Sequence, residues 1–285
     1  MDKQNNGGLP PSAVAAVSAK RAFNHFVTRP ETQTYLDKVL GAEKNAFISN
    51  LVGLYNSAPM LQACEPASVM YSAIKATALK LPLDANLGFA YVIPYGTKAQ
   101  FQIGWRGFVQ LALRTNLYRT INVRDVRLGE IVGEDFASGE LKFAPLPADT
   151  RSETPIVGYL AFFELTNGFR KMSYWTIAEL QQHGMKYSKT FNRRDSVWQT
   201  NFDAMARKTV LKLLLGRFGP MSVELQTALK SDQASFDAKG TEVYVDNDEC
   251  APAPSDEEVK EDTDNDAAKV MAAAEASEDK GKTSN

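Results

Sequence analysis

The sequence predicts an α+β fold, in which an antiparallel sheet of hairpins packs against helices and a disordered acidic tail follows. Three observations predict this fold. Apolar residues recur at helical spacing before residue 82 and again from residue 196. Between these regions they alternate with polar residues in segments that end at turn residues. Helices, then a run of strands, then further helices are typical of a sheet covered by helices.

The N-terminal region is predicted to be helical after a short leader. Residues 1–22 are rich in Gly, Pro, Ala and Ser, which indicates a flexible leader. The globular domain is expected over residues 23–230. Proline suits the first turn of a helix, so Pro66 marks a helix start. The helices of this region are expected over residues 31–40, 43–58 and 66–81.

Two hairpins are predicted in the middle of the chain. The first has the three-residue connection Gly96-Thr97-Lys98, where glycine can adopt a positive φ. The second has Asn167-Gly168, the strongest short hairpin signal. The expected strands of these hairpins are residues 89–95 with 99–103 and residues 158–166 with 169–175, and further strands are expected over 118–126 and 140–146.

Helices return after the second hairpin. Thr176 and Glu179 have the spacing of a capping box, which predicts a short helix there. Residues 196–218 form the strongest predicted helix, and Gly219-Pro220 ends it. A shorter helix is expected over 222–230. The apolar stripe of the long helix is predicted to consist of Trp198, Phe202, Met205, Thr209 and Leu213, with Leu214 and Leu215 adjacent to it.

The net charge of −2 hides a strong segregation of charge. Residues 241–285 contain 14 acidic and 4 basic residues, a local charge of −10. The first 240 residues contain 28 basic and 20 acidic residues, a local charge of +8. The tail, taken as residues 231–285, is predicted to be disordered. It is either a solubilising appendage or a segment that docks a partner or competes with a polyanion for the basic domain.

Several function classes are disfavoured by the composition. No apolar run reaches the roughly 18 residues that a membrane-spanning helix needs. The N-terminus lacks the layout of a signal peptide. Cys64 and Cys250 are far apart, which favours a reducing compartment over a disulfide framework. We therefore expect a cytoplasmic protein with no membrane partner.

Cofactor motifs are weak. Gly281-Lys282-Thr283 resembles the end of a phosphate-binding loop, but Ala276 stands where the earlier glycine should be, and the segment lies in the tail. We expect no ATP requirement. His25 and His183 have no metal-ligating residue at the usual spacing, so no metal site is predicted from them.

One catalytic pattern is present. Asp125, followed by Glu140 and Lys142, resembles the D…ExK arrangement of metal-dependent nucleases, in which two carboxylates hold Mg²⁺ and the lysine orients water. The solvated face of a strand explains the same residues equally well. A Mg²⁺-dependent nuclease is therefore the alternative function.

Basic residues interleaved with aromatic ones favour polyanion binding. Lys208 and Lys212 are four residues apart, off the predicted apolar stripe, so they are expected to point at a ligand. A solvated helix face, with Arg207 paired to Asp203, is the alternative. The candidate DNA-binding residues are Lys98, Trp105, Arg106, Arg114, Lys186, Lys189, Arg193, Arg194, Arg207, Lys208 and Lys212. No catalytic or metal-binding residue is predicted.

Three motifs resemble the RecT family of phage single-strand annealing proteins. They are a hairpin of the form L-G-x-A-Y-x-x-P-(F/Y)-G at residues 87–96, an I-G-(Y/W)-(R/K)-G junction at 103–107, and a W-x₆-M-A-x-K-T helix at 198–209. The resemblance extends from about Phe23 to Leu229. Trp105, where tyrosine is commoner, departs slightly from the pattern.

The resemblance implies an ATP-independent protein that binds single-stranded DNA and anneals complementary strands in homologous recombination. It also implies a homo-oligomeric ring or helical filament, encoded by a phage or prophage in a bacterial host. The implied partners are a phage exonuclease and the host single-strand binding protein. A protein that coats single strands without accelerating their pairing is a third hypothesis.

The junction at residues 103–107 is predicted to bind phosphate. Gly104 is expected where the backbone needs a close approach or a positive φ, and Gly107 removes a side chain from the first helical turn. Backbone N–H groups at this helix start would then face an anion, with Arg106 beside it. Trp105 either stacks on a base or packs in the core.

Overall fold

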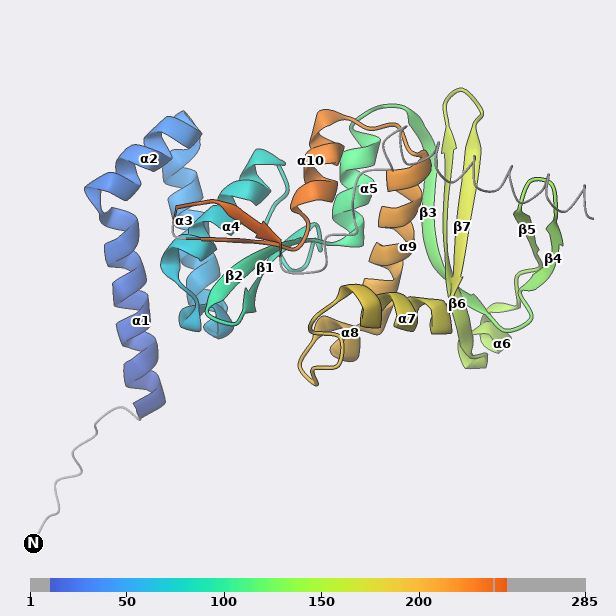
Figure 1. The fold of residues 1–285 in the computed structure, drawn as a ribbon, viewed down its shortest axis with the longest axis horizontal. Helices are drawn as coiled ribbons and strands as arrows, with labels where there is room; N and C mark the ends of the chain where they lie inside the picture. The colour runs from blue at the N-terminus through green and yellow to red at the C-terminus, as the bar shows by residue number, and fades with distance from the viewer. Residues whose placement is uncertain (1–10, 238, 245–285) are drawn as a thin grey trace, which may run out of the picture. The chain divides into compact units, whose positions relative to one another are not determined.

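The computed structural model describes residues 11–237 and 239–244, which form helices and three antiparallel sheets (Figure 1). The predicted α+β class is therefore confirmed. The strand orders are β1-β2-β8-β9, β3-β6-β7 and β4-β5. Among the described residues, no helix has both the length and the apolar character needed to cross a membrane.

The N-terminal helices share one buried cluster with the β1–β2 hairpin. They are α1 (Pro11–Thr28), α2 (Pro30–Leu40), α3 (Lys44–Ser57) and α4 (Pro66–Ala78), with 3₁₀ turns at Gly41–Glu43 and Pro59–Ala63. Helix α1 corrects the predicted leader, because the part of residues 1–22 from Pro11 onward is helical. Proline at the helix start and the Ala-rich sequence favour this helix, and Phe23 and Val27 bury its inner face.

The first sheet contains the predicted first hairpin. Strand β1 (Ala90–Tyr95) pairs with β2 (Lys98–Ile103). Tyr95 is the partner of Lys98, so the connection has two residues rather than the predicted three, and Gly96 adopts a φ of +59° there.

Strands β8 (Ala234–Phe236) and β9 (Glu242–Tyr244) complete the first sheet. Residues 234–236 are fully buried, so the globular body extends beyond residue 230, where the sequence predicted the tail to begin. The pairing of β8 with β2 is what places them there, and such a short strand has little local signal. The rest of the predicted tail, residues 245–285, lies outside the described residues.

The second sheet contains the predicted second hairpin. It consists of β3 (Tyr118–Arg127), β6 (Ile156–Leu165) and β7 (Arg170–Thr176). Asn167-Gly168 forms the turn, with a φ of +87° at Gly168. The strand expected at 140–146 is β5 (Glu140–Phe143), which pairs with β4 (Ile131–Asp135) as a separate hairpin. Helix α6 (Ala148–Glu153) follows it.

The remaining helices are α5 (Trp105–Leu113), α7 (Ile177–Tyr187), α8 (Val197–Thr200), α9 (Phe202–Phe218) and α10 (Val223–Ser231). The capping box of Thr176 and Glu179 is confirmed at the start of α7. The long helix predicted over 196–218 is broken at Asn201, whose non-helical backbone (φ −149°, ψ 65°) separates α8 from α9. The Asn201 side chain accepts a hydrogen bond from the Ala204 N–H and caps α9.

Helix α9 is the centre of the core. It packs on strands β3, β6 and β7 and also against α5. Buried residues therefore occur all round its middle turns, including Lys208, Val210, Leu211 and Leu214. The sequence predicted a single apolar stripe. That prediction is wrong for α9, because a helix covered on several sides has no polar face at its middle.

Candidate nucleic-acid interface

A surface groove of about 570 Å³ lies where the three motifs meet. Its walls come from residues 88–93 beside and in β1, residues 102–106 at the β2–α5 junction, and residues 197–208 of α8 and α9. Segments that are more than ninety residues apart in the sequence thus form one concave surface. Such a surface is the natural candidate for a ligand site.

The two junction glycines allow close backbone packing. The Gly104 N–H donates a hydrogen bond of 3.0 Å to the Phe89 carbonyl. A Cβ atom on Gly104 would lie 2.2 Å from the Gly88 carbonyl oxygen, and one on Gly107 would lie 2.1 Å from that of Phe89. The sequence predicted that Gly104 permits either a close backbone approach or a positive φ. Because its φ is −77°, the close approach is the reason that applies. This packing fixes the start of α5 at the groove.

The start of α5 combines two features that attract anions. The N–H groups of Trp105 and Arg106 belong to the first helical turn and have no intrahelical acceptor. The Arg106 side chain is exposed, and its guanidinium lies 5.4 Å from the centroid of the Trp105 ring. Among the described residues Arg106 has no ion pair with a carboxylate. The helix start and this cation together form a candidate phosphate site.

Trp105 lies between Arg106 and the main core cluster. Its ring is partly buried and packs against the main core cluster. Of the two predicted roles, the structure therefore favours core packing. The guanidinium of Arg106 lies over the ring, a cation–π contact at the surface of the start of α5.

Lys208 and Lys212 do not point outward at a ligand as the sequence predicted. Their ammonium groups lie 2.8 Å and 3.0 Å from the two carboxylate oxygens of Asp232. The Asp232 side chain is 0% exposed and that of Lys208 only 6%. The Ile103 N–H donates a third hydrogen bond, of 3.0 Å, to the same carboxylate. These lysines are therefore structural, because they neutralise a buried acid that also holds the end of β2.

The charges around Asp232 decide its ionisation. Burial alone opposes a charged carboxylate, but Lys208, Lys212 and the Ile103 N–H outweigh it and hold the pKa of Asp232 below its usual range. Nearby, burial together with the charges of Lys212 and Lys186 lowers the pKa of His183 to about 4. His183 is thus neutral at neutral pH.

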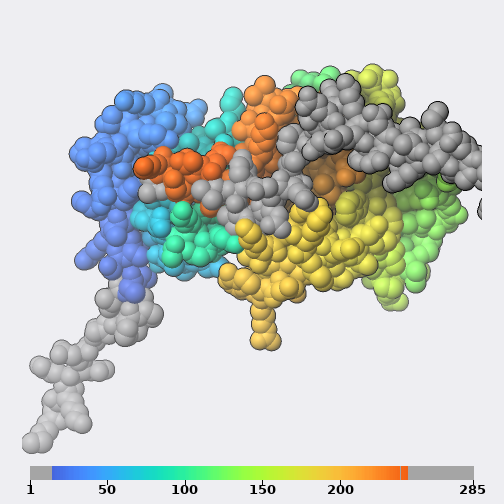
Figure 2. Space-filling view, in the orientation of Figure 1, coloured from blue at the N-terminus to red at the C-terminus, as the bar shows by residue number. Residues whose placement is uncertain are grey.

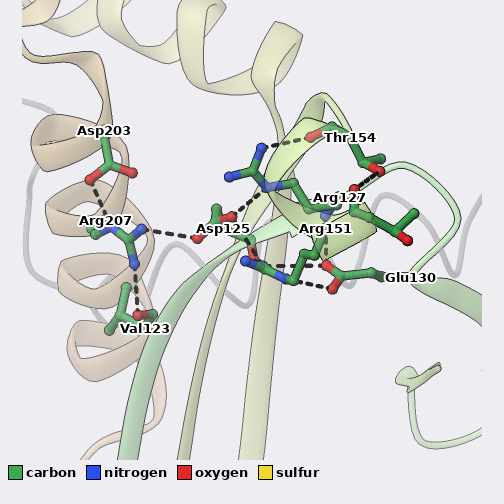
Figure 3. A network of polar contacts seen from close by, with 9 residues as sticks. Val123, Asp125, Arg127, Glu130, Arg151, Thr154, Asp203 and Arg207 are labelled. Carbon is green, nitrogen blue, oxygen red and sulfur yellow. Dashed lines mark hydrogen bonds and ion pairs between the residues drawn. The ribbon is translucent and has the colours of Figure 1, made fainter. Parts of the chain in front are cut away.

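Arg207 also has internal partners (Figure 3). It donates to Asp203 at 2.8 Å, which is the intrahelical pair that the sequence offered as the alternative, and to the Val123 carbonyl at 3.0 Å. A third bond, of 3.1 Å, reaches Asp125. Arg207 therefore joins the groove wall to strand β3 and is not an uncompensated cation.

Asp125 is surrounded by arginines rather than by carboxylates (Figure 3). Arg127 and Arg151 donate to one of its oxygens at 2.8 Å and 3.0 Å, and Arg207 donates to the other. Burial opposes its charge, but the hydrogen bond from Arg127 and the charge of Arg151 help to hold the pKa of Asp125 below its usual range.

The nuclease alternative is not supported by this geometry. Glu140 lies in the β4–β5 sheet, whereas Asp125 lies in the β3–β6–β7 sheet. The Glu140 carboxylate pairs with Arg170 through two hydrogen bonds of 2.9 Å and 3.0 Å. Both carboxylates of the D…ExK pattern are thus engaged by arginines. In the described part of the chain, no group of three or more His, Cys, Asp or Glu residues could hold a metal ion.

The other candidate residues lie away from the groove or beside it. Lys98 lies at the turn end of β2, the opposite end from the junction. Arg114, at the far end of α5, donates to the Leu79 and Lys80 carbonyls at 2.7 Å each and caps α4. The segment between α7 and α8, gold in Figure 2, lies on the surface next to the groove wall at Val197. The exposed candidates on it and at the end of α7 are Lys186, Lys189, Arg193 and Arg194, of which Arg193 pairs with Asp195 at 2.8 Å.

Tyr91 and Asn201 line the groove but were not among the predicted site residues. Tyr91 is 37% exposed, and its neighbours Ala90 and Val92 are buried. The alternation along this strand, together with the tyrosine of the hairpin motif, is the signal that could have placed it on the outer face. Asn201 has no such signal, because its exposure depends on the helix break.

Comparisons with known proteins agree with these motifs. The model of the RecT family matches residues 45–247, which include all three groove-lining segments. The chain is 42% identical over 204 residues to the uncharacterized protein YqaK of Bacillus subtilis (strain 168), across 72% of this chain and 69% of that protein. It is 25% identical over 239 residues to protein RecT of Escherichia coli (strain K12), across 81% of this chain and 86% of that protein.

Proposed function

The chain belongs to the RecT family, and on this premise we propose that it binds single-stranded DNA without ATP and anneals complementary strands. Membership of the family supports strand annealing, DNA binding and a role in recombination. The proposal adds the site, the absence of a nucleotide requirement and the mechanism.

The groove at the start of α5 is the observation that carries the proposal. Arg106 and the free N–H groups of the first helical turn offer a charged fork and backbone donors to the same anion. Contacts of this kind hold the phosphate backbone and carry no sequence information. The base edges of the bound strand then stay free to pair with a second strand.

Annealing follows from charge neutralisation. Two phosphate backbones repel each other, which slows pairing, and a basic surface that binds one strand removes part of this repulsion. The net charge of +8 over residues 1–240 supplies such a surface. No bond is made or broken, so the proposed mechanism needs neither a nucleotide nor a metal ion.

Self-association completes the proposed mechanism. The family supports self-association and single-strand binding. We propose that copies of the chain assemble as a ring or helical filament along the strand. A phage exonuclease would supply that strand, and a host single-strand binding protein would compete for it. These steps would take place in the cytoplasm of a bacterial host.

The test mixes two complementary labelled oligonucleotides with and without the full chain, in EDTA and then in Mg²⁺, without ATP. We expect faster pairing with protein in both buffers and no loss of DNA length. Binding without acceleration would indicate a protein that only coats the strand.

A nuclease would give a different result in the same assay. The DNA would shorten in Mg²⁺, and Glu140→Ala would stop the shortening. Under our proposal Glu140→Ala leaves the DNA intact and still anneals these oligonucleotides, because Glu140 pairs with Arg170 outside the groove.

A further inference from the structure

The β4–β5 hairpin contributes nothing to the core of the described residues. No residue of 131–143 belongs to the buried hydrophobic clusters there. The two strands pair with each other and with no other strand among those described. A lone two-stranded hairpin is marginally stable in water. Folding stability therefore does not explain why the chain contains this hairpin.

The base of this hairpin is held by buried ionic contacts (Figure 3). Glu130, which directly precedes β4, is 4% exposed and accepts hydrogen bonds of 2.7 Å from Arg151 and from the Arg127 N–H. The Glu130 carbonyl accepts a bond of 2.9 Å from the Ala144 N–H, directly after β5. The chain thus enters and leaves the hairpin at one fixed point.

Contacts with β7 hold the flank of the hairpin. The bidentate pair of Glu140 with Arg170 joins β5 to β7, and the Leu141 N–H lies 3.3 Å from the sulfur of Met172. A hairpin fixed at its base and along one side loses little further freedom when it binds a partner. Such preorganisation favours a docking element.

The tip of the hairpin presents an apolar side chain to water. Phe136 is 101% exposed, and Val132 on the outer face is 62% exposed. The turn that carries Phe136 is ordered, because Asp135 accepts hydrogen bonds from the N–H and the hydroxyl of Ser138 at 2.8 Å and 2.9 Å. Burial of this side chain against a partner would therefore favour association.

The charge of the hairpin indicates which kind of partner it fits. Residues 131–143 contain Glu134, Asp135 and Glu140 against Lys142, a local charge of −2. This acidic arm would be repelled by the phosphates of DNA, and two such arms would repel each other. It is complementary to a basic protein surface, and the body of this same chain carries an excess of basic residues.

We propose that the β4–β5 hairpin docks through Phe136 onto the basic surface of a second copy of the chain. This inference rests on the proposed function, because the assembly on DNA brings copies next to each other. Since the arm and its receiving surface differ, the contact is heterologous. Repetition of a heterologous contact generates a ring when it closes and a helical filament when it does not.

The first test compares two full-length variants that each remove one exposed apolar side chain. Phe136→Ser removes the tip, and Val223→Ser, on α10 and 76% exposed, is the matched control. Light scattering should show at least a twofold smaller mean mass for Phe136→Ser, with wild-type melting temperature, and no change for Val223→Ser. A wild-type mass for Phe136→Ser, or an equal loss in both variants, would overturn the proposal.

The second test identifies the receiving surface. A photo-crosslinking phenylalanine analogue at position 136 should link the hairpin to a basic segment of another copy, at low and at moderate salt. A crosslink to DNA, to the same chain, or from hairpin to hairpin contradicts the proposal.

The annealing assay separates this inference from the proposed function. Phe136→Ser should still bind a short single-stranded oligonucleotide, because the groove is unchanged, while it anneals long strands more slowly. If the wild-type chain anneals strands and Phe136→Ser assembles normally, the hairpin inference alone fails. If the wild-type chain neither assembles nor anneals, the proposed function fails with it.

Discussion

The start of α5 and the middle of α9 both carry basic residues of the sequence motifs, but these residues have different surroundings. Arg106 at the start of α5 is exposed and has no carboxylate partner among the described residues. Lys208 in α9 is buried against Asp232. The two regions face the same groove. The difference teaches that a cation's partner, and not its place in a motif, decides whether it can bind DNA.

Removal of Asp232 should have the largest effect. Asp232→Ala leaves Lys208 and Lys212 without their shared carboxylate, and an uncompensated buried charge costs roughly 3–5 kcal/mol. We expect the free energy of unfolding, measured by urea denaturation, to fall by about this amount. Asp195→Ala, which breaks the exposed pair with Arg193, is the control and should change it little. Equal stabilities for the two variants would show that the buried cluster is not structural.

Two helical glycines give the next contrast. Gly107→Ala places a Cβ atom against the Phe89 carbonyl, so we expect a loss of roughly 1–3 kcal/mol in the free energy of unfolding, together with weaker DNA binding. Gly216→Ala in α9 meets no atom within 4 Å and should stabilise the protein by about 0.5–1 kcal/mol. Thermal melts of both variants check this. A neutral Gly107→Ala would mean that the junction does not need its close approach.

His183, on α7, makes the stability of the fold sensitive to acid. Its pKa is about 4 in the fold and about 6.5 in the unfolded chain, so the unfolded state binds a proton first as the pH falls. The stability from neutral His183 is complete above about pH 6.5 and is lost towards pH 4, by up to roughly 2 kcal/mol at about pH 5. His183→Gln should flatten the dependence of unfolding free energy on pH in this window. An unchanged profile would place the sensitivity elsewhere.

Arg106 should give the smallest effect on stability and a clear effect on DNA. Arg106→Ala removes one phosphate contact, so the slope of log affinity against log salt should become shallower by about 0.7. The free energy of unfolding should not change, because the side chain is exposed. Arg21→Ala, an exposed arginine on α1, is the matched control. Equal slopes for both variants would exclude Arg106 from the interface.

Local features of the fold were predictable from the sequence. Gly96, Asn167-Gly168 and the Thr176 capping box each specify a turn or a helix start within a few residues. The break at Asn201 was not predicted, because the apolar pattern continues through it. Helix α1 was missed because its composition resembles that of a leader.

The site was predictable only in part. The motifs singled out the junction at Arg106 as part of a binding site, and Arg106 does line the groove. The role of Lys208 was predicted wrongly, because its partner Asp232 is 24 residues away and was assigned to the tail. Spacing along a helix reveals which side chains share a face. It does not reveal what a distant segment places against that face.

The position of β8 near the end of the body has a consequence for synthesis on the ribosome. Asp232 and the strand that pairs with β2 are among the last parts of the body to leave the exit tunnel. Until then the Asp232 carboxylate is absent from Lys208 and Lys212, and the edge of β2 that pairs with β8 is open. A nascent chain that has already exposed the junction at residues 103–107 therefore still lacks part of its first sheet.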